Sequence, residues 1–249
     1  MKRDLQKELN DGNLCLGTWL SLGSSVIAEI AAECGFAWLL FDLEHGFGTE
    51  ATLLPQLQAI RGANVSAIVR VGAPHPDLIL RALDWGADGI MVPHVSNVTE
   101  AENVVRAMNY APRGHRGFSR SARVYSYGLK PPGDAKDIKS PLFMAQIENI
   151  EGVENVHEIA AVDGVDVLFV GPADLQFDLN ARPEKAVRSF QDCLERVASA
   201  AKKAGKTCGI LIRNPEEISK YRELGFTCLA MDSDLAILRK GFQKLLENS

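Results

Sequence analysis

Short apolar segments alternate with segments of helical pattern along the whole chain, and this alternation constrains the fold more than any other feature. Eight segments are apolar at nearly every position rather than at every second one. That pattern is typical of parallel strands buried on both faces of a sheet. The predicted strands are Leu14–Leu20, Trp38–Asp42, Ser66–Arg70, Gly89–Val92, Leu142–Glu148, Asp166–Val170, Lys206–Ile212 and Phe226–Asp232.

The segments between these strands show helical spacing of apolar residues, and several end at a glycine. Eight strands alternating with helices in 249 residues predict an α/β fold, a single (β/α)8 TIM-barrel domain over residues 1–249. A doubly wound sheet is the alternative. Residues 110–141 and 171–183 break the alternation and are expected to be irregular. The predicted helices are Ser24–Cys34, Thr49–Arg61, Asp77–Trp85, Val98–Asn109, Glu151–Ala160, Glu184–Ala204, Pro215–Leu224 and Asp234–Glu247.

Composition excludes several classes of protein. An apolar fraction of 46% is too high for a disordered chain, and no apolar run approaches the roughly 18–20 residues of a membrane span. A formal net charge of −5 without a run of lysine or arginine argues against nucleic-acid binding. Five cysteines without a C-x-x-C motif, and an N-terminus without an apolar signal segment, favour a cytoplasmic location.

Polar residues follow the predicted strands at their carboxyl ends, where barrel enzymes place their reactive groups. Arg70 and Glu148 end otherwise apolar segments, at which an unpaired charge is costly to bury. Their presence at one rim is the main indication of an active site. The rim residues are Asp42, Glu44, His45, Arg70, Pro93, His94, Gln146, Glu148, Gly171, Pro172, Ala173, Asp174, Asp232 and Ser233.

Glu148 and Asp174 are candidate ligands of a divalent metal ion. Two carboxylates with few supporting imidazoles suit Mg²⁺, Mn²⁺ or Co²⁺, which retain bound water. The alternative is that each carboxylate caps a helix or pairs with a cation.

His45 is a candidate general base, and Asp42 and Glu44 are near enough in sequence to orient its imidazole. A histidine satisfied within a turn is the alternative. Arg70 is a candidate clamp for a substrate carboxylate. Its alternative is a buried ion pair with Asp42 or Glu148.

Two kinds of chemistry are not expected. Lys139 and Lys206 fall before or at the start of their strands, at the end opposite the rim, so no Schiff-base lysine is predicted. The sequence has no P-loop and no G-x-G-x-x-G after a strand, so no nucleotide cofactor is predicted.

An ordered set of motifs resembles the HpcH/HpaI family, whose members are metal-dependent (class II) pyruvate aldolases. No single motif is sufficient, but together they span nearly the whole chain. The motifs are F-D-L-E-H-G at 41–46, V-R-V at 69–71, G-A-D-G-I-M-V-P-H-V at 86–95, Q-I-E at 146–148 and F-V-G-P-A-D-L at 169–175.

The resemblance implies a role for each matching position. His45 is implied to be the general base, and Arg70 to hold pyruvate and stabilise its enolate. Glu148 and Asp174 are implied to ligate the metal. The resemblance also implies that the keto acid contacts Gln146, Ala173 and Asp174.

Asp84 matches a residue that is implied to increase the basicity of the histidine. It lies near the carboxyl end of the helix predicted at Asp77–Trp85, which places it at the other end of the barrel. Either this helix is short, or Asp84 serves the site of a neighbouring subunit. The second option fits the family, which is typically hexameric, a trimer of dimers with the last helix exchanged between subunits.

The activity implied is reversible cleavage of a 4-hydroxy-2-oxo acid into pyruvate and an aldehyde, with no nucleic-acid or membrane partner. A lyase of acyl-CoA thioesters, similar to citrate lyase β and malyl-CoA lyase, is one alternative. An oxaloacetate decarboxylase and a non-catalytic binder of keto acids are others. The sequence departs from the family in the loop around Arg113–Arg123 and in Gln176–Pro183, so the aldehyde stays open.

Overall fold

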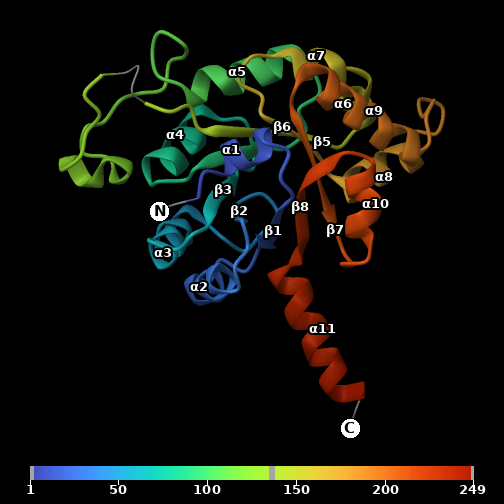
Figure 1. Ribbon diagram of the computed structural model, residues 1–249, viewed down its shortest axis with the longest axis horizontal. Coiled ribbons are helices and arrows are strands. Elements are labelled where there is room, and N and C mark those ends of the chain that lie inside the picture. The colour runs from blue at the N-terminus through green and yellow to red at the C-terminus, as the bar shows by residue number, and fades with distance from the viewer. Residues whose placement is uncertain (1–2, 135–137, 248–249) are drawn as a thin grey trace.

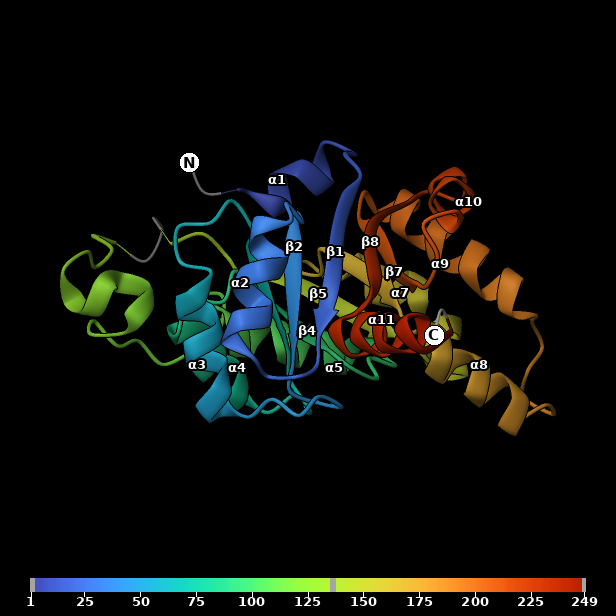
Figure 2. The same cartoon turned by 90° about the horizontal axis from the view of Figure 1, so that it is seen from below.

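Neighbouring strands pair in parallel along the chain. The last strand, β8 (Phe226–Ser233), pairs with the first, β1 (Cys15–Leu20), which closes a barrel (Figures 1 and 2). The computed structural model describes residues 3–134 and 138–247. The predicted (β/α)8 fold is therefore confirmed, and each strand lies within about one residue of its expected bounds. The strands are β1 (Cys15–Leu20), β2 (Trp38–Asp42), β3 (Ser66–Arg70), β4 (Gly89–Val92), β5 (Leu142–Ile147), β6 (Val167–Val170), β7 (Thr207–Ile212) and β8 (Phe226–Ser233).

Most helices follow the strands as predicted. The helix expected at Glu151–Ala160 is divided at Asn155 into two helices, and a helix that was not expected precedes the first strand. Residues 171–183 were expected to be irregular, and this expectation is wrong, because they contain the helix α8 with Pro172 in its first turn. The helix expected from Glu184 begins instead at Phe190, because Ser189 and Asp192 form a capping box there. The helices are α1 (Leu5–Asn10), α2 (Ser25–Glu33), α3 (Glu50–Ala59), α4 (Pro76–Asp84), α5 (Val98–Met108), α6 (Ile150–Glu154), α7 (Val156–Ala161), α8 (Pro172–Ala181), α9 (Phe190–Ala204), α10 (Glu217–Glu223) and α11 (Asp234–Glu247), with a short 3₁₀ helix at Arg123–Gly128.

Side chains fill the inside of the barrel, so it is a packed core rather than a channel. Trp38 and Phe169 are fully buried there and their rings meet edge to face, with centroids 6.1 Å apart. Leu5 and Leu9 of α1 belong to the same interior cluster. Figure 2 shows α1 at one end of the barrel and the start of α8 at the other. The carboxyl ends of the strands are therefore the end that α1 does not cover.

The last helix, α11, extends away from the barrel (Figure 1). Its first residue, Asp234, accepts the backbone N–H groups of Ser21 and Leu22 and so fixes the helix to the end of β1. Beyond that anchor its apolar side chains are exposed, Phe242 to 65% and Leu246 to 76%. In the part of the chain that the structure describes, no helix has the length and apolar character that a bilayer crossing requires. The exposed stripe leaves the predicted exchange of this helix between subunits untested.

The contact between Gly17 and Trp38 makes the packing of the barrel testable. A Cβ atom at Gly17 would lie 2.3 Å from the indole ring of Trp38, whose Nε1 donates to the carbonyl of Cys15. We predict that Gly17→Ala lowers the free energy of unfolding by about 1–3 kcal/mol, the usual cost of overpacking a core. Urea unfolding at a fixed protein concentration measures it. Gly241→Ala in α11, where no atom lies within 4 Å of the added Cβ, is the matched control, and equal effects of the two substitutions would contradict the prediction.

Candidate active site

The barrel opens at the carboxyl ends of its strands, and we term this opening the mouth. The alternation of inward- and outward-facing side chains along the strands continues into it. Leu40 and Ile68 belong to the interior cluster, and Asp42 and Arg70 follow each of them by two residues. Because side chains alternate along a strand, Asp42 and Arg70 also face inward. They are partners in the register of β2 and β3. The fold therefore places both charges at the same level of the mouth.

Arg70 is fixed by two carboxylates. Its Nε lies 2.9 Å from Asp42 Oδ1 and its Nη2 lies 2.8 Å from Asp42 Oδ2, a bidentate arrangement. Its Nη1 lies 2.9 Å from Glu44 Oε2. The guanidinium also lies over the ring of Trp19, 5.1 Å from the centroid. The ion pair expected as an alternative for Arg70 thus forms with Asp42, and it holds the cation rigidly at the floor of the mouth.

Glu148 is buried directly after β5, and the residues around it leave just enough room for its carboxylate. Oε1 accepts the backbone N–H of His94 at 2.8 Å, and Oε2 accepts the side-chain amide of Gln146. A Cβ atom at Gly171 would lie 2.3 Å from Oε2, so only glycine fits there. Asn149, and not Glu148, caps the helix α6, which removes the capping alternative for Glu148.

Several carboxylates act on one another at this point. Burial raises the pKa of Glu148 to about 8; the His94 N–H opposes the shift, and the charges of Asp174 and Glu44 add to it. Asp174 lies in the first turn of α8, which begins beside Glu148 because Gly171 packs on its carboxylate. A buried carboxyl group whose pKa is raised in part by neighbouring carboxylates is a donor suited to a divalent cation.

The donor set offers few ligands, which fits an ion that keeps several waters. Among residues 3–134 and 138–247 no group of three or more His, Cys, Asp or Glu side chains has the geometry of a metal cage. Gln146 Oε1 is buried, and within the same residues it has no hydrogen-bond partner. A buried acceptor of this kind is costly unless something binds it. The residues present therefore fit a partly hydrated divalent ion held by Glu148 and Asp174.

Two histidines border the carboxylates. His45 is largely exposed and its Nε2 lies 3.6 Å from Glu44 Oε1. His94 has a left-handed backbone, with φ of 54°, and its Nδ1 lies 3.3 Å from Glu148 Oε1. Sequence reasoning gave His94 less weight than His45, although both follow strands at the same rim. The structure places His94 nearer to the proposed metal ligand than the sequence argument indicated.

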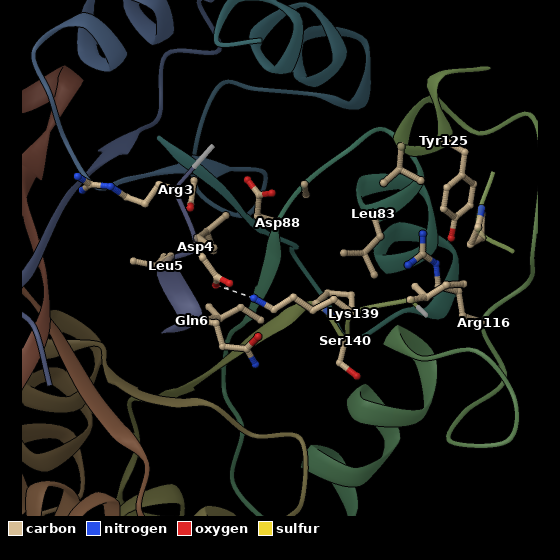
Figure 3. A pocket seen from close by; sticks show the side chains of 18 of the residues that line it. Arg3, Asp4, Leu5, Gln6, Leu83, Asp88, Arg116, Tyr125, Lys139 and Ser140 are labelled. Carbon is tan, nitrogen blue, oxygen red and sulfur yellow. Dashed lines mark hydrogen bonds and ion pairs between the residues drawn. The ribbon is translucent and has the colours of Figure 1, made fainter. Parts of the chain in front are cut away.

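Asp84 and the described parts of segment 110–141, residues 110–134 and 138–141, lie apart from these residues. Asp84 ends α4, and its Oδ1 accepts from Arg116 Nη2 at 2.6 Å. A cavity of about 530 Å³ adjoins Arg116, between α1, the starts of β3 and β5, and segment 110–141. Figure 3 shows Lys139 reaching across it to Asp4, at 2.6 Å. Because the starts of strands line this cavity, it lies at the end of the barrel away from Glu148.

The raised pKa of Glu148 makes stability depend on pH in the metal-free protein. The folded state binds this proton more tightly than the unfolded state, whose pKa is near 4.5. The stabilisation is complete below pH 4.5 and is lost as pH rises through about 8. Glutamine does not titrate, so the variant does not lose this stabilisation as pH rises. We predict that the free energy of unfolding of Glu148→Gln, measured relative to wild type, is about 2–4 kcal/mol higher at pH 8.5 than at pH 5. Urea unfolding in the presence of chelator measures this.

Glu151→Gln, on the exposed surface of α6, is the control for that comparison. Its stability should follow the wild-type curve at both pH values. Parallel curves for wild type and Glu148→Gln would show that the carboxylate is not held in the environment described.

Comparisons with known proteins identify the family of the chain. The family model described as HpcH/HpaI aldolase/citrate lyase matches residues 16–240. A 5-keto-4-deoxy-D-glucarate aldolase of Salmonella arizonae is 37% identical over 93% of this chain and 91% of its own. A crystal structure of a HpcH/HpaI aldolase/citrate lyase family protein from Burkholderia cenocepacia has a TM-score of 0.89 and 32% identity over 98% of both chains. A citrate lyase structure from Burkholderia xenovorans shares only the fold, with a TM-score of 0.64 and 14% identity over 89% of this chain and 73% of its own. The chain therefore belongs to the HpcH/HpaI aldolase/citrate lyase family.

Proposed function

We propose that the protein is a metal-dependent pyruvate aldolase, a carbon–carbon lyase that reversibly cleaves a 4-hydroxy-2-oxo acid into pyruvate and an aldehyde. The observation that carries this proposal is buried Glu148, which faces Asp174 and Glu44 beside the fixed guanidinium of Arg70. Family membership and the relatives named 5-keto-4-deoxy-D-glucarate aldolase support it.

The metal would be held by Glu148 and Asp174, with Mg²⁺, Mn²⁺ or Co²⁺ as the candidates. When bound, the ion supplies a Lewis acid for the carboxylate and the 2-oxo oxygen of the substrate. Gln146, Ala173 and Asp174 would contact the keto acid. The hydrogen bond from Gln146 to Glu148, and the position of the other two residues in the first turn of α8, support this.

The residues of the chain itself would then perform the remaining tasks. Arg70 brings positive charge to the oxygen that becomes negative as the C3–C4 bond breaks, and Asp42 holds it there, so no reorganisation is needed. His45 is the base that takes the proton of the C4 hydroxyl, because its imidazole is exposed and Glu44 lies close enough to orient it. The resulting imidazolium would return a proton to C3 of the enolate, which releases pyruvate; the same imidazole would exchange the methyl protons of pyruvate in the reverse direction.

Within its own chain Asp84 pairs with Arg116. Asp84 would therefore act on the histidine of a neighbouring subunit, not on that of its own chain. We propose a homo-oligomer, a hexamer built as a trimer of dimers, in which the exposed apolar stripe of α11 is covered by a neighbouring copy. The single barrel domain would work in the cytoplasm, where its five free thiols stay reduced.

The thioester-lyase alternative is less favoured. The citrate lyase structure resembles this chain in fold only, whereas the aldolase relatives match most of the sequence. A thermal shift on adding coenzyme A separates the two, because an acyl-CoA lyase would be stabilised by coenzyme A. An oxaloacetate decarboxylase would share the enolate and is compatible as a side activity.

The proposed function can be tested without knowing the aldehyde. The protein is first stripped of metal with a chelator and incubated with pyruvate in D₂O. We predict that the methyl proton signal of pyruvate is lost when Mg²⁺, Mn²⁺ or Co²⁺ is added back, because enolate formation exchanges those protons for solvent deuterium. His45→Ala and Arg70→Ala should each slow this exchange by at least about 100-fold. Proton NMR measures the rate.

His75→Ala is the matched control, since the His75 and His45 side chains are equally exposed at 63%. It should exchange at the wild-type rate. A folded, metal-loaded wild-type protein that exchanges with none of the three ions would overturn the proposed function.

Substitution of Gly171, beside Glu148, tests the proposed metal ligands through metal affinity, without a measurement of turnover. We predict that Glu148→Ala abolishes metal binding and that Gly171→Ala weakens it by at least about 10-fold, because the added methyl displaces the carboxylate. Titration calorimetry with Mn²⁺ measures both. Gly117→Ala, whose added Cβ meets only the end of Leu80 at 3.4 Å, is the control; unchanged affinity in Gly171→Ala would remove Glu148 from the ligand set.

A further inference from the structure

A second group of charges lies at the carboxyl ends of β7 and β8. Asp232 is buried near the end of β8, with its side chain only 10% exposed. Its Oδ1 accepts from Arg213 Nη1 at 2.7 Å, and its Oδ2 accepts from Lys240 Nζ at 2.7 Å. Arg213 directly follows β7 and Lys240 lies in α11. Three elements thus bring one buried carboxylate and two cations together.

This group lies on the same rim of the barrel as Asp42 and Arg70. Arg213 directly follows β7 and Asp232 lies near the end of β8, where the pairing of β1 with β8 shifts register. Both residues therefore lie at the carboxyl ends of their strands, which is the end of the barrel that carries the candidate active site. The proposed chemistry uses residues on or directly after β2, β3, β5 and β6, and this group lies on a part of the rim that the chemistry does not use.

Trp19 connects the two parts of the mouth. The guanidinium of Arg70 lies over its ring, and its register partner on β8 is Ser233, the neighbour of Asp232. The ring of Phe169 lies 5.7 Å from that of Trp19. A molecule held at Arg70 therefore meets an aromatic floor and then the part of the rim that carries Asp232.

The two parts of the mouth differ in charge. Arg70 pairs with the carboxylates of Asp42 and Glu44, and the charges of Arg70, Glu44 and Asp174 all act on the carboxyl group of Glu148. Negative charge therefore predominates in this part of the mouth. At the ends of β7 and β8, two cations share the single carboxylate of Asp232, which leaves one positive charge in excess within that group. Glu217 also lies close, but it accepts the backbone N–H of Arg213 and caps the following turn.

Both cations are open to a ligand. The side chain of Arg213 is 55% exposed and that of Lys240 is 51% exposed. Burial alone would raise the pKa of Asp232, but the hydrogen bonds from Lys240 and Arg213 bring it below its ordinary value, so the carboxylate stays ionised and keeps both cations in place.

The backbone of Asp232 has an uncommon conformation. Its φ is 52°, in the left-handed region, which aspartate enters more readily than most residues other than glycine. In this conformation its carboxylate accepts the hydrogen bonds from both Arg213 and Lys240.

We propose that Arg213 and Lys240, positioned by Asp232, form an anion subsite that binds a carboxylate on the aldehyde half of the substrate. The inference rests on the proposed function, because it takes the pyruvate half to lie between Arg70 and Glu148. The subsite selects aldehydes that carry an acid group over neutral aldehydes of the same length, since a carboxylate gains charge-assisted hydrogen bonds there.

The test compares aldehydes in the condensation direction with the metal-loaded enzyme and pyruvate. Two matched pairs of equal carbon number are used: glyoxylate against acetaldehyde, and succinate semialdehyde against butyraldehyde. Wild type should prefer the acid in at least one pair. Arg213→Gln and Lys240→Met should each lower that preference, the ratio of the two kcat/KM values, by about 10- to 100-fold, mainly through the KM of the acid.

Arg213→Lys keeps the charge and should keep most of the preference. Arg222→Gln, on exposed α10 between the same two strands, should behave as wild type. No preference for the acid in either pair, or a preference that survives both Arg213→Gln and Lys240→Met, would overturn the inference. Exchange of the pyruvate methyl protons distinguishes failure of the subsite from failure of the proposed function. If wild type exchanges the protons but shows no preference for the acid, only the subsite is overturned. If wild type does not exchange them, the proposed function is overturned as well.

Discussion

Burial of Glu148 among other carboxylates is the interaction on which the account of this molecule depends. Its oxygens accept from the His94 backbone and the Gln146 amide, yet burial and the charges of Asp174 and Glu44 still raise its pKa to about 8. A carboxylate so placed costs free energy when ionised unless a cation joins it. Arg70, whose positive charge opposes this shift, is already held by Asp42 and Glu44. The mouth is therefore built to take a further positive charge.

The barrel makes this arrangement possible because side chains two residues apart on a strand point the same way, from the packed interior to the rim. Interior residues such as Leu40 and Ile68 are packed tightly, and the polar residues two positions later inherit their direction. Arg213 and Asp232 lie at the carboxyl ends of β7 and β8, on the same rim. One end of the mouth is then suited to a metal and a keto acid, and the other to an anion. A substrate with acid groups at both ends would match this distribution of charge.

The sequence was sufficient to predict all eight strands, because their apolar segments are short, continuous and bounded by turns. Arg70, Gln146 and Glu148 were found for the same reason: polar residues at the ends of such segments must share one rim. The helix α8 was missed because Pro172 and Gly171 read as a break, although proline is well suited to a first helical turn. The group of Arg213 and Lys240 was not recognised either, since their meeting at Asp232 depends on the direction of α11, which local pattern does not determine. Asp84 pairs with Arg116 across 32 positions, a contact that no spacing rule predicts.

Proton release on metal binding tests the central claim most directly. With a pKa of about 8, Glu148 is mostly protonated at pH 7 and has to lose its proton to become a ligand. Titration calorimetry with Mn²⁺ at pH 7, repeated in buffers of different ionisation enthalpy, counts the protons. The account predicts release of about one proton per ion in wild type, and a smaller release as pH rises to 9. Binding without proton release at pH 7, or binding of equal strength in Glu148→Gln, would contradict it.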